Sequence, residues 1–366
     1  MKKKEQSDVK SNSAKKKRGG KVAYVLTSML GVVVILLSVA YGVFHHYYSK
    51  LNTDAISYDP NEYEISDTDL KISESDLEAL NETLYQDLGD GLVFDEKNVT
   101  NILLVGTDGR TRGNKQTRSD AMIVISINRN TKKVIMTSFM RDIYVAIPNK
   151  EDNHNRLNTA FAQGGPDLLF KTLKKNFGIK IEKYVHIDFY NFMDLVDAVG
   201  GVDLVVDQGE LNVINLYYLP QLNTALGLPT NTDFIYGSPG LVHMNGKQAL
   251  AYTRVRYVGQ GDFERTERQR RVLTQIMDKA KTLSVSEMNR LLDVVLPLIS
   301  TNLTQGEVMS LIVNSPEYLS YDLESYRIPI DHSYSYVNLE SGAAVLGVNF
   351  RMNKNFWEKT VYGDNS

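Results

Sequence analysis

The sequence predicts an α/β fold: a layered α/β/α domain with a mixed central sheet, carried on a single N-terminal transmembrane anchor. Short apolar runs typical of buried strands alternate with apolar patterns of helical period over most of the chain, as they do in α/β layers. Two strand patterns are joined by a short polar turn, which indicates a hairpin and therefore a sheet that is not purely parallel. A long uncharged run near the N-terminus predicts the anchor.

The anchor is predicted at residues 22–45. Residues 22–44 are 23 positions without a charged side chain, and about 20 apolar residues suffice to cross a bilayer core. A cleaved signal peptide is disfavoured because its apolar core would be shorter. The first 21 residues hold nine Lys and Arg, and basic flanks stay in the cytoplasm. We therefore expect a single-pass protein of the cell membrane, with residues 1–21 as a cytoplasmic tail and the C-terminal part outside the bilayer.

The charge and the cysteine content of the chain exclude several classes of function. The chain has 41 Lys and Arg against 44 Asp and Glu; nine basic and two acidic residues lie in residues 1–21, which leaves 32 against 42, a formal charge of −10. An acidic domain binds nucleic acid poorly, so no nucleic-acid partner is expected. The chain has no cysteine, which excludes disulfides and thiol chemistry and, for an exported domain, suits a bacterial surface.

Composition divides the rest of the chain into three parts. Residues 46–95 are polar and acidic and predict an extracellular stalk, with one short helix near residues 74–88. Residues 96–335 contain the regular patterns and predict the folded domain. Residues 336–366 form a C-terminal tail to which the sequence assigns no role.

The domain begins with three strand patterns. Residues 101–106 form a fully apolar run that ends in glycine, and residues 121–129 and 133–140 form two more. The polar residues 128–132 between the last two are typical of a hairpin turn.

Helices and strands then alternate along the chain. Apolar residues recur at helical spacing in residues 156–178, and Gly178 is placed as a C-terminal cap. Residues 208–241 are irregular and predict a long loop, and Asp262 is placed as the N-cap of a charged helix. The remaining predicted elements are strands at 183–189 and 202–206 and helices at 191–200, 262–282, 286–300 and 305–315.

Charged residues stand directly at the ends of the first three strand patterns, where ligand sites form in open α/β sheets. Asp108 follows the first strand, but no P-loop or dinucleotide fingerprint accompanies it, and an aspartate there is also typical of an ordinary turn. Arg118 and Asp120 precede the second strand, and Arg141 and Asp142 follow the third. If these strands pair as a hairpin, the charges lie side by side, as either a structural ion-pair network or a functional site.

Asp108 and Asp120 together also suggest a metal site. Two carboxylates supply oxygen ligands that suit Mg²⁺, which commonly binds one or two carboxylates and completes its shell with substrate phosphate oxygens.

The strongest cluster holds six arginines in 18 residues and no lysine: Arg254, Arg256, Arg265, Arg268, Arg270 and Arg271. The planar guanidinium suits bidentate phosphate recognition better than the point charge of lysine. Arg265, Arg268 and Gln269 share one helical face, and a helix N-terminus is itself an anion site. A solvated helix face is the alternative interpretation, since Glu264 and Glu267 are interleaved.

Several motifs, in this order, resemble the LytR–CpsA–Psr family of bacterial envelope proteins: GTDGR, RSD, SFMRD followed by IP, RLNTAFAQGG, VDAVGGVDL and GKQALAYTRVR…GDFERTERQR. The resemblance covers about residues 98–285 and makes residues 96–335 a catalytic domain of that type. It implies a phosphotransferase that moves a glycopolymer, such as wall teichoic acid or capsular polysaccharide, from an undecaprenyl-diphosphate carrier to peptidoglycan. A lipid pyrophosphatase and a non-catalytic regulator, such as a transcription attenuator, remain alternatives.

The resemblance also implies residue roles. Asp108 and Asp120 would hold Mg²⁺ against the diphosphate, and the residues that would bind its oxygens are Arg118, Arg141, Arg254 and Arg256, with Arg265, Arg268 and Gln269 completing the site. Asp142 and Asp262 are ionisable neighbours whose roles stay open, with general base for the muramic acid hydroxyl as one possibility. The implied catalytic set is Asp108, Asp120, Arg141, Asp142, Arg254 and Arg256. An apolar groove for the prenyl chain is expected to be lined by Phe161, Leu168, Leu169, Phe170, Phe192, Leu195 and Val199, which also fit a structural core.

Overall fold

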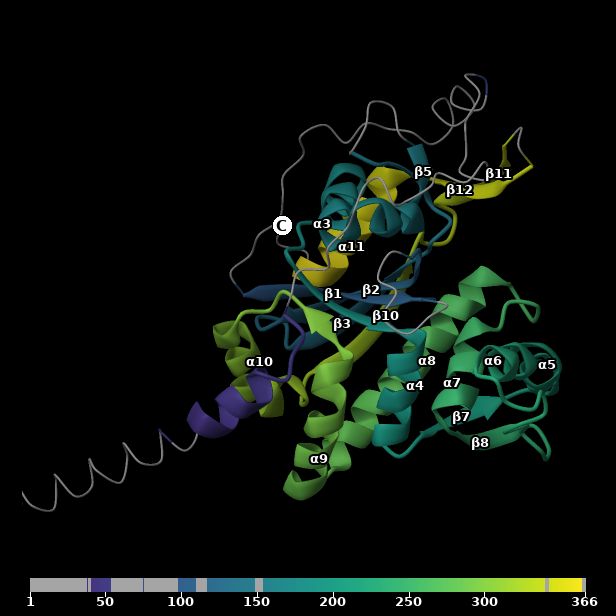
Figure 1. Cartoon of the computed structure of the whole chain (residues 1–366). Helices are drawn as coiled ribbons and strands as arrows, with labels where there is room; N and C mark the ends of the chain where they lie inside the picture. The colour runs from purple at the N-terminus through teal and green to yellow at the C-terminus, as the bar shows by residue number, and fades with distance from the viewer. Residues whose placement is uncertain are drawn as a thin grey trace, which may run out of the picture. The chain divides into compact units, whose positions relative to one another are not determined.

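The computed structural model describes residues 38, 41–53, 75, 98–109, 117–148, 154–339 and 342–363 (Figure 1). The chain forms two units, Met1–Lys50 and Leu51–Ser366. In the first, residues 41–48 are helical. The second unit contains all the strands and helices discussed below.

The predicted anchor and stalk fall mostly outside the described residues. Of residues 22–45 the structure describes 38 and 41–45, and of the helix predicted at residues 74–88 it describes only 75. Within the described part of the chain, no helix combines the length and the apolar character that crossing a membrane requires.

A mixed sheet forms the centre of the second unit, as predicted, and it has six strands. Its strands lie in the order β10-β3-β2-β1-β6-β9. The central strand β1 pairs antiparallel with β2 and parallel with β6, and β3 pairs antiparallel with β2 and parallel with β10. The predicted hairpin is confirmed. The strand bounds are β1 Val99–Thr107, β2 Ser119–Asn128, β3 Lys133–Phe139, β6 Lys183–Asp188, β9 Ser300–Thr301 and β10 Asp322–Ile328.

Helices cover both faces of this sheet (Figure 1). The helices α3 (Leu157–Phe177) and α11 (Phe350–Tyr362) lie on one face, and α4 (Phe189–Ala198) and α8 (Asp262–Thr282) lie on the other. In α3, Gly164 and Gly165 depart from helical geometry before Pro166, so the helix is kinked. Gly178 caps α3 with φ 70°, as predicted.

The main core lies between the sheet and α3. Leu103 of β1 and Val124 of β2 are completely buried in it, together with Leu169 of α3. Trp357 of α11 is 1% exposed and belongs to the same cluster. A domain boundary at residue 335 would cut through this core, so the described C-terminal residues are part of the domain.

A second apolar cluster lies on the side of the sheet that α4 and α8 cover. The elements that form it correct the prediction for residues 208–241. The predicted loop 208–241 is wrong over its first half, because residues 208–225 are helical. Asp207 and Glu210 form a capping box that starts this helical run, and Leu211 and Leu222 are buried in the second cluster. Its elements are α5 (Gln208–Val213), a π-helical turn η1 (Ile214–Tyr218), α6 (Leu219–Ala225) and α7 (Gly246–Arg254).

The remaining elements complete the domain. β7 (Val202–Val206) was predicted as a strand, but it pairs with β8 (Gly240–Met244) outside the central sheet. The N-cap of α8 is Gly261, and Asp262 is the first helical residue rather than the cap. Other short elements are β4 Tyr144–Ala146, β5 His154–Arg156, α9 Val285–Val295, η2 Leu296–Leu298, α10 Gln305–Tyr318, β11 Tyr334–Asn338 and β12 Ala344–Val348.

Candidate active site

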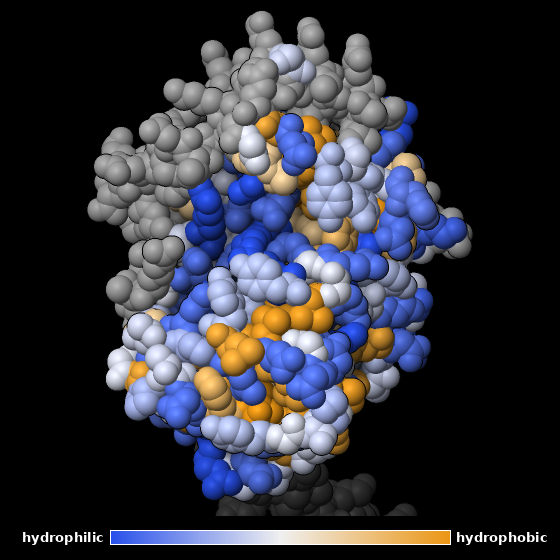
Figure 2. All heavy atoms as spheres, turned by 90° about the vertical axis from the view of Figure 1, so that its right-hand side faces the viewer, coloured by the Kyte–Doolittle hydropathy of each residue, from blue (hydrophilic) through white to orange (hydrophobic). Residues whose placement is uncertain are grey.

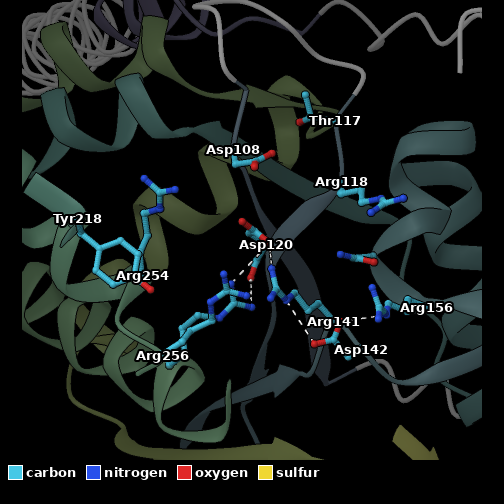
Figure 3. A pocket seen from close by; sticks show the side chains of 12 residues that line it. Asp108, Thr117, Arg118, Asp120, Arg141, Asp142, Arg156, Tyr218, Arg254 and Arg256 are labelled. Carbon is cyan, nitrogen blue, oxygen red and sulfur yellow. Dashed lines mark hydrogen bonds and ion pairs between the residues drawn. The ribbon is translucent and has the colours of Figure 1, made fainter. Parts of the chain in front are cut away.

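The strand ends bring the predicted charged residues together. Since β1 and β3 are both antiparallel to β2, the ends of β1 and β3 lie beside the start of β2. Asp108 therefore follows β1 next to Asp120 near the start of β2, and Arg141 follows β3 on its other side. Figure 3 shows the side chains of these residues around one pocket.

The pocket has a volume of about 450 Å³ and is lined mainly by charged residues. Six arginines line it against three aspartates, so the lining carries excess positive charge. Figure 2 shows hydrophilic residues gathered in a recess in the upper half of one face of the molecule. The pocket residues are Asp108, Thr117, Arg118, Asp120, Arg141, Asp142, Arg156, Asn158, Tyr218, Arg254, Arg256 and Arg265.

Asp120 is held in its charged form by two guanidinium groups. Its Oδ1 accepts a hydrogen bond from Arg141 Nη1 at 2.7 Å and lies 3.5 Å from Arg265 Nη1. Burial by itself raises the pKa of the Asp120 carboxyl, but the positive charges of Arg265 and Arg141 outweigh it and hold the pKa below its ordinary value. Asp120 is therefore a fixed negative charge at neutral pH.

Arg141 joins three carboxylates in one network. Besides Asp120, its guanidinium lies 3.5 Å from Asp142 Oδ2 and 3.4 Å from Asp262 Oδ1. Burial would lower the pKa of Arg141, yet the charges of Asp120 and Asp262 raise it above its ordinary value. A permanently charged, partly buried guanidinium with several partners is well fixed in orientation.

Residues in the first turns of α8 bind Asp120 and Asp262 and so hold this network in place. Arg265 Nη2 donates to the backbone oxygen of Asp120 at 3.1 Å, and its Nε lies 3.1 Å from Asp262 Oδ1. Gln269 Nε2 donates to the same Asp120 oxygen at 3.4 Å. Arg265 lines the pocket. Gln269 acts on the backbone of Asp120 rather than on the pocket itself.

Arg254 and Arg256 have no carboxylate within ion-pair distance among the residues the structure describes. Arg254 ends α7, and its guanidinium stacks between two rings, 5.2 Å from the centroid of Phe189 and 5.6 Å from that of Tyr218. Burial lowers the pKa of Arg254, and the charges of Asp120 and Asp108 offset this only in part. These two cations of the pocket are therefore available to an anionic ligand.

Arg268 is not brought to the pocket, in contrast to the prediction. It is 3% exposed, and its Nε donates to Glu210 Oε1 at 2.7 Å while its Nη2 donates to Glu264 Oε2 at 2.8 Å. Its Nη1 donates to the backbone oxygen of Val255. Arg268 thus joins α8 to α5, and its charge is already neutralised.

Sequence reasoning missed four residues of the pocket. Arg156 and Asn158 are the first and third residues of the quoted RLNTAFAQGG motif, so the motif could have pointed to them. They were missed because they do not belong to a cluster of charged residues in the sequence. Arg156 Nε lies 3.3 Å from Asp142 Oδ1, which extends the network. Tyr218 lies in the segment that was predicted as a loop. Thr117 precedes Arg118 and belongs to no motif that marks it as functional.

A second, more apolar pocket adjoins the first. It has a volume of about 340 Å³ and shares Asp108 and Arg254 with the charged pocket. Its other lining residues come from the end of β1 and from α4, α6 and α7: Gly109, Phe189, Tyr190, Met193, Gln221, Leu222, Ala225, Leu226 and Leu250.

Of the two interpretations of the predicted groove residues, the structure supports the structural core and not the groove lining. The first four predicted residues, Phe161, Leu168, Leu169 and Phe170, belong to the core beneath α3. The other three, Phe192, Leu195 and Val199, belong to the second apolar cluster. The apolar pocket uses other side chains of α4, together with α6, whose helical run was not foreseen.

Comparisons with known proteins agree with this arrangement. The model of the LytR_cpsA_psr family matches residues 53–360. The chain is 33% identical to biofilm regulatory protein A of Streptococcus mutans over 261 residues, 66% of this chain and 59% of that protein. It is 32% identical to the polyisoprenyl-teichoic acid–peptidoglycan teichoic acid transferase TagU of Bacillus cereus over 232 residues, 63% of this chain and 68% of that protein.

Solved structures share the fold. The structure of TagT bound to LI-WTA superposes with a TM-score of 0.57 at 25% identity, covering 76% of this chain and 96% of TagT. Protein gbs0355 of Streptococcus agalactiae superposes with a TM-score of 0.60 at 24% identity, covering 81% of this chain and 93% of that protein. The family match over residues 53–360 establishes that the chain belongs to the LytR–CpsA–Psr family.

Proposed function

We propose that the chain transfers a glycopolymer, such as wall teichoic acid or capsular polysaccharide, from an undecaprenyl-diphosphate carrier to peptidoglycan by Mg²⁺-assisted phosphoryl transfer. One observation carries the proposal: an arginine-rich pocket and an apolar pocket meet at Asp108 and Arg254. A lipid diphosphate has this same division, with anionic oxygens next to a long apolar chain. Relatives named as teichoic acid transferases support the assignment.

The diphosphate would bind where positive charge lacks a partner. Arg254 and Arg256 would donate to its oxygens, and Arg118 lines the same pocket. The rings of Phe189 and Tyr218 fix the orientation of Arg254, so its fork is set before the substrate binds. In phosphoryl transfer the protein mainly positions groups and neutralises charge, and this arrangement supplies both.

The donor set also fits Mg²⁺. Asp108 and Asp120 are carboxylates in one pocket, and Asp120 is held ionised. No group of three or more His, Asp or Glu suited to a metal occurs in the described residues, so a cation here would draw its other oxygens from the substrate, as Mg²⁺ commonly does. When bound, Mg²⁺ would neutralise charge on the diphosphate.

The acceptor hydroxyl needs a group to take its proton. Asp142 lines the pocket, whereas Asp262 lies between Arg141 and Arg265 and is not among the lining residues. Asp142 is thus the better placed general base for a muramic acid hydroxyl. Asn158 lines the pocket too, and its buried Oδ1 has no hydrogen-bond partner, so it can accept from that hydroxyl and orient it.

The predicted anchor would keep the candidate active site close to the membrane. A single membrane-spanning helix at residues 22–45 would hold the domain on the outer side of the cell membrane, beside a substrate whose prenyl chain lies in the bilayer.

Product analysis tests the proposal. The full-length protein in detergent would be incubated with a lipid-diphosphate-linked glycan and uncross-linked peptidoglycan, with Mg²⁺ or with a chelator, and the products identified by mass spectrometry. Metal-dependent glycan–phosphate–peptidoglycan adducts are expected. Free glycan phosphate alone would indicate a lipid pyrophosphatase, which uses the same pocket with water as acceptor. The absence of any turnover with several glycans would favour a regulator, the role by which the Staphylococcus aureus relative MsrR, 30% identical over 69% of this chain and 71% of its own length, is named.

A further inference from the structure

Arg270 is a buried cation that the candidate active site does not use. It is 8% exposed, and its Nε and Nη1 atoms are buried without a hydrogen-bond partner. Burial lowers the pKa of Arg270 to about 10, and the nearby positive charges of Arg327 and Arg271 act in the same direction against the partial compensation by Glu267. A guanidinium in this state is costly unless an anion meets it.

The other arginines of α8 show how unusual this is. Arg265 has Asp262 and Asp120, Arg268 has Glu210 and Glu264, and Arg271 has Glu267. The carboxylate of Glu267, which would be the natural partner of Arg270, is thus already used. Among the arginines of this helix, all of which the structure describes, Arg270 is the one without a carboxylate within ion-pair distance.

Arg270 lines a hollow of its own. The hollow has a volume of about 570 Å³ and shares no residue with the charged or the apolar pocket described above. It lies between α8, the β7–β8 pair and β10, and is lined by Asp203, Leu204, Val205, Leu241, Glu267, Arg270, Arg271, Thr274, Gln275 and Ser325.

Charge in the hollow selects a ligand with one negative charge. Asp203 is held by Lys279 at 3.1 Å and by His243 at 2.7 Å, and Glu267 is held by Arg271. The charge left over is the single one of Arg270. Because the two carboxylates of the lining already have cationic partners, one negative charge is enough to balance Arg270, so a monoanion is the better match.

The rim of the hollow is apolar. Val205 and Leu241 are cross-strand partners of β7 and β8, and they are 68% and 73% exposed. An adjacent pair of large apolar side chains left in water beside a buried cation indicates a ligand that covers them. The ligand therefore combines an oxyanion with an apolar group next to it.

We propose that this hollow is a second binding site, in which Arg270 receives the oxyanion of an amphipathic monoanion, a carboxylate or a phosphodiester, while Val205 and Leu241 contact its apolar part. Two N–H groups of a guanidinium match two oxygens of either group. The proposal does not depend on the reaction at the candidate active site.

The cysteine-free chain allows a direct test. Ser325 is exposed and lines the hollow, so Ser325→Cys places one thiol there in the full-length protein in detergent. The rate of thiol modification by a methanethiosulfonate reagent is measured with and without ligand. N-acetylleucine and dibutyl phosphate are the carboxylate and phosphodiester probes, and N-acetylleucine amide is the uncharged control. We expect either or both anions to slow modification several-fold and saturably, and the amide to leave it unchanged.

Matched arginine variants assign the effect. Adding Arg270→Met should abolish protection, whereas adding Arg254→Met removes the same charge from the candidate active site and should preserve it. Protection by N-acetylleucine alone identifies a carboxylate site, and protection by dibutyl phosphate alone a phosphodiester site. No protection by either anion, or protection that survives Arg270→Met, would overturn the proposal. Arg270→Met loses an uncompensated buried charge, so its melting temperature should not fall, and that measurement confirms that the variant is folded.

Discussion

Asp120 and Arg141 lie side by side at one end of the neighbouring strands β2 and β3, with Arg141 Nη1 2.7 Å from Asp120 Oδ1. One stands near the start of β2 and the other directly after β3, so the hairpin itself creates the pair. Each partner stabilises the charge of the other: the pKa of Asp120 is lowered and the pKa of Arg141 is raised. The pair is thus a preorganised charge centre at the base of the pocket.

Replacing Asp120 should abolish transfer without unfolding the protein. Asp120→Asn keeps the size of the side chain but removes its charge, so the proposed Mg²⁺ site would lose one of its two carboxylates and Arg141 would lose its closest ionic partner. We expect turnover to fall by at least about 100-fold, the scale on which a single preorganised electrostatic group acts. Product formation by mass spectrometry measures this, with circular dichroism as the control for folding. Unchanged turnover would remove Asp120 from the proposed metal site.

The same carboxyl predicts a pH dependence of stability. Because the folded pKa of Asp120 lies below its unfolded value of about 3.9, its contribution is full above that unfolded pKa and is lost as the pH falls through the folded pKa. Between about pH 4 and lower values, wild-type protein should lose stability more steeply than Asp120→Asn. Urea unfolding at a series of pH values measures the two slopes, and parallel curves would show that Asp120 is not the group responsible.

Replacing Arg254 with lysine should weaken substrate binding although the charge remains. Lysine cannot make the planar fork, and it would lose the stacking between Phe189 and Tyr218. We expect KM for the lipid diphosphate to rise by about tenfold, equivalent to about 1.4 kcal/mol. Arg271→Lys on the exposed side of α8 is the matched control. A fully active Arg254→Lys enzyme would mean that only net charge matters at this position.

Local patterns predicted much of the fold and the centre of the site. The hairpin follows from two apolar runs and a polar turn, and it alone is enough to place Asp120 beside Arg141. Gly178 caps α3 as its position indicates, and α8 occupies the predicted residues 262–282. These features depend on neighbours in sequence, and sequence shows such neighbours directly.

Features that depend on distant partners could not be predicted in the same way. Arg268 shares a helical face with Arg265, but it forms a buried ion pair with Glu210 of α5 instead of lining the charged pocket. This could not be foreseen because α5 lies in a segment that was predicted as a loop. Val202–Val206 has the pattern of a strand, yet nothing in it shows that β8 rather than the central sheet is its partner. Similarly, the tail after residue 335 has no pattern that reveals its packing against α3.

The pair between Arg268 and Glu210 should be structural. Both side chains are nearly inaccessible, so Arg268→Met leaves the carboxylate of Glu210 buried without its main partner. Removing one member of such a pair costs about 3–5 kcal/mol, whereas replacing both by apolar residues is often neutral. Urea unfolding should therefore show a large loss for Arg268→Met and recovery in Arg268→Met/Glu210→Met. If the double variant were stable and still failed to bind the lipid diphosphate, Arg268 would have a direct role in binding.

Filling the apolar pocket should discriminate between carrier lipids. Ala225 is exposed at the end of α6 and lines this pocket, so Ala225→Trp adds bulk there without disturbing the core. We expect transfer from a long-chain prenyl diphosphate to fall, and transfer from a short-chain analogue to remain close to wild type. Kinetics with both substrates test this, with Ala225→Ser as the control for the position. Equal losses for both lipids would indicate that the prenyl chain binds elsewhere.

The C-terminal helix α11 should be required for folding rather than for the reaction. Trp357 is 1% exposed and packs edge-on against Tyr362 in the main core, and α11 also contacts α3. Trp357→Ala would leave a large cavity and should cost about 3–5 kcal/mol of unfolding free energy. Urea unfolding measures this, and KM of the remaining folded protein should be unchanged. The exposed Met352 of the same helix offers a matched control, because Met352→Ala removes a large side chain that leaves no cavity. A Trp357→Ala protein as stable as Met352→Ala would mean that α11 is dispensable, and the domain would then end before it.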